Sequence, residues 1–139
     1  MGTRITGGCL CGAVRYEYEG EVGAAGYCHC EDCRRTSGSA FGVSVRVAAA
    51  GFRTTRGEPR AFTKAGDSGR LVTRCFCPDC GSPLFTLPPL HPEVVLIKAG
   101  SLDDPSVVAP NRQAWMRSKV AWAEIAEGLT SYDTNRPGS

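Results

Sequence analysis

Eight cysteines in a chain of 139 residues constrain this protein more than any other feature of its sequence. They fall into three short groups along the chain: Cys9 and Cys11; Cys28, Cys30 and Cys33; Cys75, Cys77 and Cys80. Disulfides are rare in a reducing compartment, whereas cysteine thiolates there commonly bind metal ions. We therefore interpret seven of the eight cysteines as ligands of zinc, which prefers sulfur and nitrogen donors at tetrahedral corners.

The cellular compartment is inferred from two features that the sequence lacks, a secretory signal and a membrane-spanning segment. Residues 1–8 contain no apolar stretch of the kind that a secretory signal carries. No run of eighteen apolar residues occurs, so no membrane-spanning segment is predicted. The sequence thus predicts a cytoplasmic protein, and one domain is expected at this length.

The charge of the chain gives no indication of a nucleic-acid partner. The formal net charge is +2; seven thiolates subtract seven and two zinc ions add four, which leaves about −1. The densest basic pair is Arg34-Arg35, and no longer basic run occurs. We therefore predict no nucleic-acid partner, and the sequence predicts no oligomeric state.

The segment Cys77-Pro78-Asp79-Cys80-Gly81 is typical of a zinc knuckle. Proline fixes the approach of the chain, and glycine permits a positive φ, so that backbone N–H groups can face the sulfurs. One knuckle supplies only half of a tetrahedral site. Pairing it with Cys9 and Cys11 would complete a structural four-cysteine site. The alternative is that Cys9 and Cys11 are buried free thiols.

Cys28, Cys30 and Cys33 form a group with no obvious fourth ligand, which is the arrangement found in catalytic zinc sites. The alternative is a second closed site, with Cys75 or His29 as its fourth ligand. Because His29 lies between two ligands, we expect its side chain to point away from the metal. Cys75 is expected to be a buried apolar residue, and exchange into the open site is the less favoured role.

Alternating apolar and polar residues predict a β-rich fold with little helix. The expected strands cover residues 14–18, 41–47, 71–76, 84–87 and 94–97. Short helices are expected at residues 31–36 and 118–126. Trp115 and Trp122 are expected to pack under the C-terminal segment. We predict one domain over residues 1–132, followed by a flexible tail over residues 133–139.

Several motifs resemble those of one known family. They are Gly7-Gly8-Cys9-Leu10-Cys11-Gly12, Tyr27-Cys28-His29-Cys30-Glu31-Asp32-Cys33, Phe76-Cys77-Pro78-Asp79-Cys80-Gly81, Ala99-Gly100-Ser101-Leu102-Asp103 and Lys119-Val120-Ala121-Trp122. On these motifs the chain resembles the glutathione-dependent formaldehyde-activating enzyme and centromere protein V family over nearly its whole length. The resemblance implies a β-tent fold, in which antiparallel sheets are tied by zinc. It also implies a structural zinc on Cys9, Cys11, Cys77 and Cys80 and a catalytic zinc on Cys28, Cys30 and Cys33.

The resemblance further implies carbon–sulfur lyase chemistry, in which glutathione and formaldehyde form S-(hydroxymethyl)glutathione. Four residues near the catalytic zinc are candidates for holding a glutathione-like anion: Arg34, Arg35, Ser37 and Ser39. Gln113 stands where family members often carry histidine, so the substrate is expected to differ if that histidine shapes the pocket. The competing hypothesis is a non-catalytic zinc-binding module that contacts a protein partner.

Overall fold

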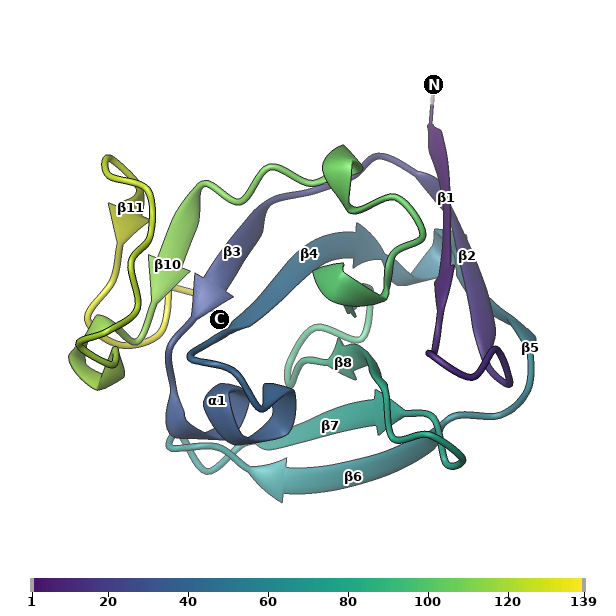
Figure 1. The fold of residues 1–139 in the computed structure, drawn as a ribbon, viewed down its shortest axis with the longest axis horizontal. Coiled ribbons are helices and arrows are strands. Elements are labelled where there is room, and N and C mark those ends of the chain that lie inside the picture. Colours follow the sequence, from purple (N-terminus) through teal and green to yellow (C-terminus); the bar gives the residue numbers. More distant parts are fainter. Residues whose placement is uncertain (1, 139) are drawn as a thin grey trace.

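The computed structural model describes residues 2–138 and is mainly β, which confirms the predicted fold class. A small antiparallel sheet contains β1 (Thr3–Gly8), β2 (Arg15–Gly20) and β5 (Phe52–Arg56), in that order. In Figure 1 this sheet stands at the right, beside a large curved sheet that occupies the rest of the molecule.

The large sheet has eight strands, and its pairing changes from antiparallel to parallel at the edge formed by β10 and β11. In order across the sheet they are β11 (Thr130–Ser131), β10 (Arg112–Ala114), β3 (Ala25–Cys28), β4 (Gly42–Ala48), β9 (Val94–Lys98), β8 (Pro83–Leu87), β7 (Leu71–Phe76) and β6 (Arg60–Ala65). The pairs from β3 to β6 are antiparallel, whereas β10 pairs in parallel with both β3 and β11. The sheet is therefore mixed at the edge that the C-terminal strands add.

One face of the large sheet forms the hydrophobic core. A single row of aligned residues crosses five strands, and every member is buried: Ala25, Val45, Ile97, Phe85 and Cys75. Aligned residues lie on the same face, so this row packs as one layer. Phe52 of the small sheet completes the layer, because its ring lies 4.8 Å from that of Phe85 and 5.3 Å from that of Tyr16.

The opposite face of the large sheet is polar and positively charged. One row on this face runs through Arg74, Thr86, Leu96 and Arg46. The next row runs through Lys98, Ser44, Gly26 and Arg112. The Lys98 Nζ atom donates a hydrogen bond to Ser44 Oγ at 3.2 Å, which confirms that these two side chains share the face. We call this surface the cationic face.

The strands predicted from alternation are confirmed as β2, β4, β7, β8 and β9, with ends shifted by one or two residues. The strands missed by the prediction are β1, β3, β5, β6, β10 and β11. All six residues of β6 are exposed, so no hydrophobic alternation marks it. Its backbone pairing with β7 alone makes it a strand.

The first predicted helix is confirmed and the second is wrong. The structure contains α1 (Glu31–Ser37) and four 3₁₀ turns: η1 (Ala49–Gly51), η2 (Ala99–Ser101), η3 (Pro105–Val107) and η4 (Met116–Ser118). Residues 119–128 contain no helix, and Ala123 is their one buried residue. A short helix with no apolar face to bury is marginal in water. Within residues 2–138, no helix is long and apolar enough to cross a membrane.

The two tryptophans behave differently from each other. Trp122 is 74% exposed, so the expectation that it packs under the C-terminal segment is wrong. Trp115 does contact that segment, since its Nε1–H donates to Asn135 Oδ1 at 2.7 Å and its backbone N–H to Thr134 O at 3.0 Å. His91 Nε2 lies 2.9 Å from Gly138 O. Part of the segment expected to be a tail therefore makes hydrogen bonds to the domain.

A hydrogen bond between the hydroxyl groups of Tyr16 and Ser101 links the small sheet to η2. Burial raises the pKa of Tyr16 to about 12, so its hydroxyl is a donor at neutral pH. It lies 2.6 Å from Ser101 Oγ, which donates to Lys98 O. We expect Tyr16→Phe to lower the free energy of unfolding by about 1 kcal/mol. Urea unfolding at a fixed zinc concentration measures the change.

Ser101→Ala and the double variant complete this test. If the hydrogen bond is the cause, the double variant is less destabilised than the sum of the two single changes. Additive effects would show that the hydroxyl groups act separately.

Candidate metal centres and the adjoining cavity

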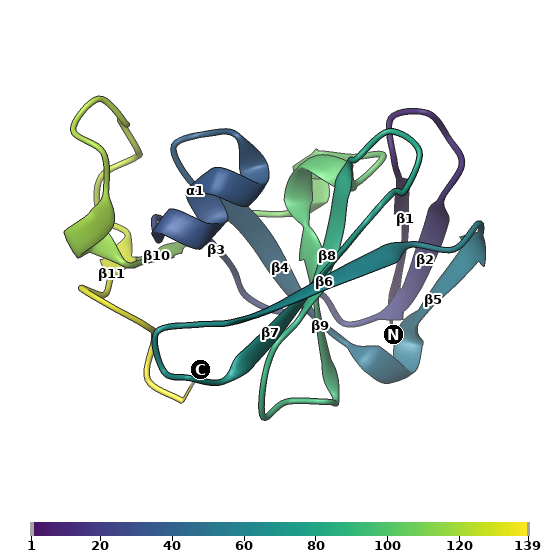
Figure 2. The same cartoon turned by 90° about the horizontal axis from the view of Figure 1, so that it is seen from below.

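Four cysteines from distant parts of the chain come together at one edge of the molecule. They form the four-cysteine cluster, whose members are Cys9, Cys11, Cys77 and Cys80. The first two lie in the loop between β1 and β2, and the other two follow β7. Figure 2 shows these two loops and α1 along the same edge of the fold. One ligand atom from each cysteine lies within 4.8 Å of every other.

The spacing of these sulfurs fits a tetrahedral metal ion. Cys9 Sγ lies 3.7 Å from Cys11 Sγ, and Cys11 Sγ lies 3.8 Å from Cys77 Sγ. A tetrahedron with metal–sulfur bonds of about 2.3 Å has edges of about 3.8 Å. A disulfide requires a separation of about 2.05 Å, and all eight cysteines are free. The cluster can therefore hold one metal ion.

The loop backbones are arranged to support negatively charged sulfurs. The N–H groups of Asp79 and Cys80 donate to Cys77 Sγ at 3.4 and 3.5 Å, and the N–H of Val14 donates to Cys9 Sγ at 3.2 Å. Gly81 has a φ of 78°, as the knuckle motif predicts. These N–H···S hydrogen bonds favour thiolates, which are the form that binds metal.

The second group is the three-cysteine cluster, made of Cys28, Cys30 and Cys33 at the start of α1. Cys28 ends β3, and Cys30 is the N-cap of α1, where its Sγ accepts a hydrogen bond from the backbone N–H of Cys33 at 3.2 Å. Hydrogen bonds from Cys28 and Cys30 lower the pKa of Cys33, and the positive charges of Lys98 and Arg74 act in the same direction. This cluster can also hold a metal ion.

Neither residue proposed as a fourth ligand belongs to the three-cysteine cluster. Within residues 2–138, no His, Cys, Asp or Glu joins the three sulfurs at ligand distance. His29 is fully buried, its ring lies edge-on to that of Phe41, and its Nε2 lies 2.9 Å from Gln113 Oε1. Cys75 is buried in the core, and burial raises the pKa of its thiol. The alternative of a second closed site finds no support in this geometry.

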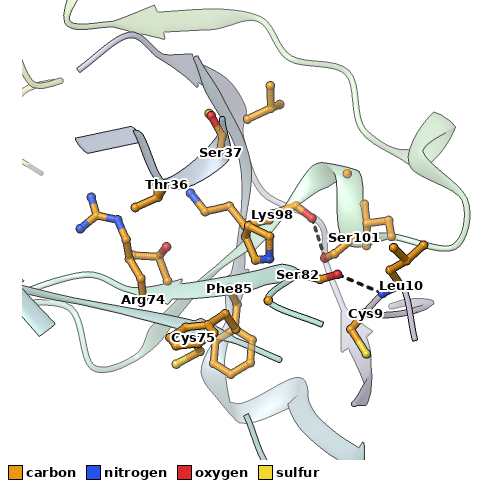
Figure 3. A pocket seen from close by; sticks show the side chains of 18 of the residues that line it. Cys9, Leu10, Thr36, Ser37, Arg74, Cys75, Ser82, Phe85, Lys98 and Ser101 are labelled. Carbon is orange, nitrogen blue, oxygen red and sulfur yellow. Dashed lines mark hydrogen bonds between the residues drawn. The ribbon is translucent and has the colours of Figure 1, made fainter. Parts of the chain in front are cut away.

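A cavity of about 780 Å³ is lined by Cys9 of the four-cysteine cluster and by Gly42, which neighbours Cys33 of the other cluster; Cys28, Cys30 and Cys33 do not line it themselves. On the side of the four-cysteine cluster its walls include Cys9, Leu10 and Ser82, as Figure 3 shows. The other side begins at Thr36 and Ser37 of α1. Gly42 belongs to that wall because a Cβ atom there would lie 3.7 Å from Cys33 Sγ and 3.8 Å from Lys98 Nζ. Glycine therefore leaves room between the sulfur and the cavity.

The predicted anion-binding residues are only partly brought together. Ser37 and Ser39 line the cavity. Arg34 and Arg35 do not, because both point toward Glu31 on α1, at 3.9 and 3.1 Å. The cavity instead presents Arg74 and Lys98. Sequence reasoning missed these two, because only strand register puts them on the cationic face beside the three-cysteine cluster.

The comparisons with known proteins agree with this arrangement. The family model described as "Glutathione-dependent formaldehyde-activating enzyme" matches residues 4–118. A crystal structure of a Rhodobacter sphaeroides protein matches with a TM-score of 0.58 and 21% identity, over 91% of this chain and 98% of that chain. At this identity the likeness concerns the fold alone. No sequence among the curated proteins matches.

The two clusters predict the metal content of the protein. We expect the anaerobically loaded wild type to bind two divalent ions per chain, and Cys80→Ser and Cys33→Ser each to bind one fewer. Cys80→Ser should also lower the melting temperature strongly, because the affinity for a structural metal contributes to folding. Elemental analysis together with thermal unfolding measures both effects.

Cys75→Ala is the matched control, since this cysteine is buried but lies in neither cluster. It should retain both ions. Loss of an ion in this variant, or retention of two in Cys33→Ser, would contradict the assignment of ligands.

Proposed function

This chain belongs to the glutathione-dependent formaldehyde-activating enzyme family, and from that we propose that it is a zinc-dependent enzyme of the carbon–sulfur lyase type. Its substrate would be a thiol/aldehyde adduct resembling S-(hydroxymethyl)glutathione. In the synthetic direction a bond forms between the thiol sulfur and the aldehyde carbon. The thiol proton is lost, and the former carbonyl oxygen gains a proton.

We assign zinc to both clusters. Sulfur donors alone, at separations that match a tetrahedron of about 2.3 Å bonds, favour zinc in the four-cysteine cluster. With all four corners taken by protein, this site is structural. Its two halves lie far apart in the sequence, because Cys77 comes 66 residues after Cys11. The ion would thus join the β1–β2 loop of the small sheet to the knuckle that follows β7.

The observation that carries the proposal is the three-cysteine cluster, which has no fourth protein ligand within residues 2–138 and lies directly behind Gly42 of the cavity wall. A zinc ion held by Cys28, Cys30 and Cys33 supplies a positive charge that lowers the pKa of a thiol placed beside it. The rest of the site is provided by the chain. Gly42 leaves space next to Cys33, and Phe62, which is aligned with Arg74 on the same face, supplies apolar surface to the cavity.

Positioning of both reactants is the main contribution that the cavity can make, because thiols add to formaldehyde without a catalyst. The side chains of Ser37 and Ser39 line the cavity at the end of α1 and can hydrogen-bond a peptide-like thiol. Glutathione is the co-substrate that the family name suggests. A cavity of about 780 Å³ is within the range of small-molecule sites.

The cellular setting follows from the same chemistry. All eight cysteines are free, and a cytoplasmic location would keep the seven proposed ligands reduced. We propose that residues 1–132 form the zinc-binding domain and that residues 133–139 are a tail, part of which is hydrogen-bonded to Trp115 and His91.

Removing one ligand of the proposed catalytic zinc tests the function. We expect Cys28→Ser to lower the catalysed rate of glutathione addition to formaldehyde by about tenfold or more, because the charge that activates the thiol is lost. Exchange spectroscopy by NMR with ¹³C-formaldehyde measures this rate, after the uncatalysed rate is subtracted.

Arg70→Gln is the control, because Arg70 is an exposed residue of the β6–β7 turn and does not line the cavity. It should react at the wild-type rate. A folded Cys28→Ser protein that binds one zinc fewer and still reacts at the wild-type rate would exclude the proposed function.

A further inference from the structure

The cationic face next to the three-cysteine cluster contains two positive charges that no carboxylate balances. Arg74 and Lys98 both line the cavity, and within residues 2–138 neither forms an ion pair with an acidic side chain. The Lys98 ammonium donates a hydrogen bond to Ser44 Oγ at 3.2 Å. The Nε atom of Arg74 is buried and has no hydrogen-bond partner.

The other charged residues around the cavity do not compensate these cations. Arg15 and Asp103 line its far side, and they form an ion pair with each other, with Arg15 Nη1 2.9 Å from Asp103 Oδ1. The neighbouring cation on β6, Lys64, is paired with Asp32 at 2.9 Å. Arg74 and Lys98 therefore have no carboxylate partner among residues 2–138, and the negative group on which both act is the Cys33 thiolate.

An independent observation at the same place comes from Thr86. This residue is aligned with Arg74 across β7 and β8, so the two side chains share the cationic face. Thr86 is only 6% exposed and lines the cavity, and its Oγ1 has no hydrogen-bond partner. A buried hydroxyl without a partner costs about 1–3 kcal/mol. Such a group is explained if a ligand supplies the missing partner.

From these groups we propose that Arg74, Lys98 and Thr86 form a subsite for a carboxylate, so that the cavity selects thiol substrates that carry a negative charge. The inference rests on the proposed function for the role of the thiol, whereas the carboxylate subsite stands on its own contacts. A carboxylate has about four acceptor positions. It can accept hydrogen bonds from the guanidinium, the ammonium and the hydroxyl together.

The position of the subsite relative to the three-cysteine cluster fits a small bifunctional molecule. Space next to Gly42 separates Cys33 Sγ from Lys98 Nζ, because a single Cβ atom there would contact both. A thiol near the sulfurs and a carboxylate near Lys98 would therefore be a few bonds apart. Figure 3 shows Arg74 and Lys98 on the side of the cavity beneath Thr36.

Two thiols of equal shape and different charge test the proposal: 3-mercaptopropionate and its neutral amide, 3-mercaptopropionamide. Binding is followed on protein loaded with cobalt(II) in place of zinc, by the absorption change when a thiol joins the metal. We expect the wild type to bind the carboxylate form at least about tenfold more tightly than the amide, as a charge-assisted hydrogen bond predicts.

The variants assign this preference to the three residues. Arg74→Gln and Lys98→Gln should each weaken the binding of 3-mercaptopropionate by about tenfold. Binding of the amide should stay within about twofold of the wild type. Thr86→Val should weaken the binding of 3-mercaptopropionate several-fold. It should not lower the stability of the protein, because the hydroxyl has no hydrogen-bond partner in the protein to lose. Arg70→Gln is the control for a general change of charge and should bind both thiols like the wild type.

Failure of the subsite and failure of the proposed function give different results. The proposed subsite is wrong if the wild type binds the two thiols equally tightly, or if the variants weaken the binding of both thiols by the same factor. The carboxylate alone is tested with propionate, monitored by the backbone amide shift of Thr86. If propionate shifts this amide in the wild type and not in Arg74→Gln, while neither thiol changes the cobalt spectrum, the subsite stands and the proposed function fails.

Discussion

The convergence of four sulfurs at one edge of the molecule is the constraint on which the rest of this structure depends. The four-cysteine cluster joins the first loop of the chain to a knuckle that begins 66 residues after Cys11. Four thiolates at separations near 3.8 Å would repel one another strongly. A multivalent cation between them would offset this repulsion. In small peptides a structural zinc contributes about 10–16 kcal/mol to folding, which is comparable to the whole net stability of a typical domain.

A metal cross-link at this place would add to a hydrophobic core that both sheets share. The small sheet has three strands, and its residues Ile5, Tyr16 and Tyr18 belong to one core cluster with residues of the large sheet such as Val45, Leu84 and Phe85. A domain of this size buries less of its surface than a larger one. A metal ion in the four-cysteine cluster would hold the β1–β2 loop against the knuckle, and so would fix the wall of the cavity that Cys9, Leu10 and Ser82 form.

The two clusters share a ligand type and differ in what surrounds them. The four-cysteine cluster is completed by protein ligands, and backbone N–H groups face its sulfurs. The three-cysteine cluster lies where β3 passes into α1, close to a face of the large sheet that carries cations and an unpartnered hydroxyl. This difference in environment supports a structural role for the first and a chemical role for the second. His29 is fully buried, and its Nε2 lies 2.9 Å from Gln113 Oε1 on β10.

The sequence by itself determined the local groups of cysteines, because short spacings and the knuckle motif keep neighbouring thiols close together. It left open which groups share a site, and the tertiary structure brings Cys9 and Cys11 together with Cys77 and Cys80. The sequence also determined the strands with strong alternation, such as β4, where Val45 and Val47 are buried and Ser44 and Arg46 are on the other face. Only the tertiary structure decided which distant groups meet. The exposed strand β6 and the short strands β10 and β11 exist because a neighbour pairs with them, and the expected helix at residues 118–126 is absent because no surface covers it. Arg74, Thr86 and Lys98 come from three strands. They share one face only through the register of the sheet, which depends on hydrogen bonds between residues far apart in the chain.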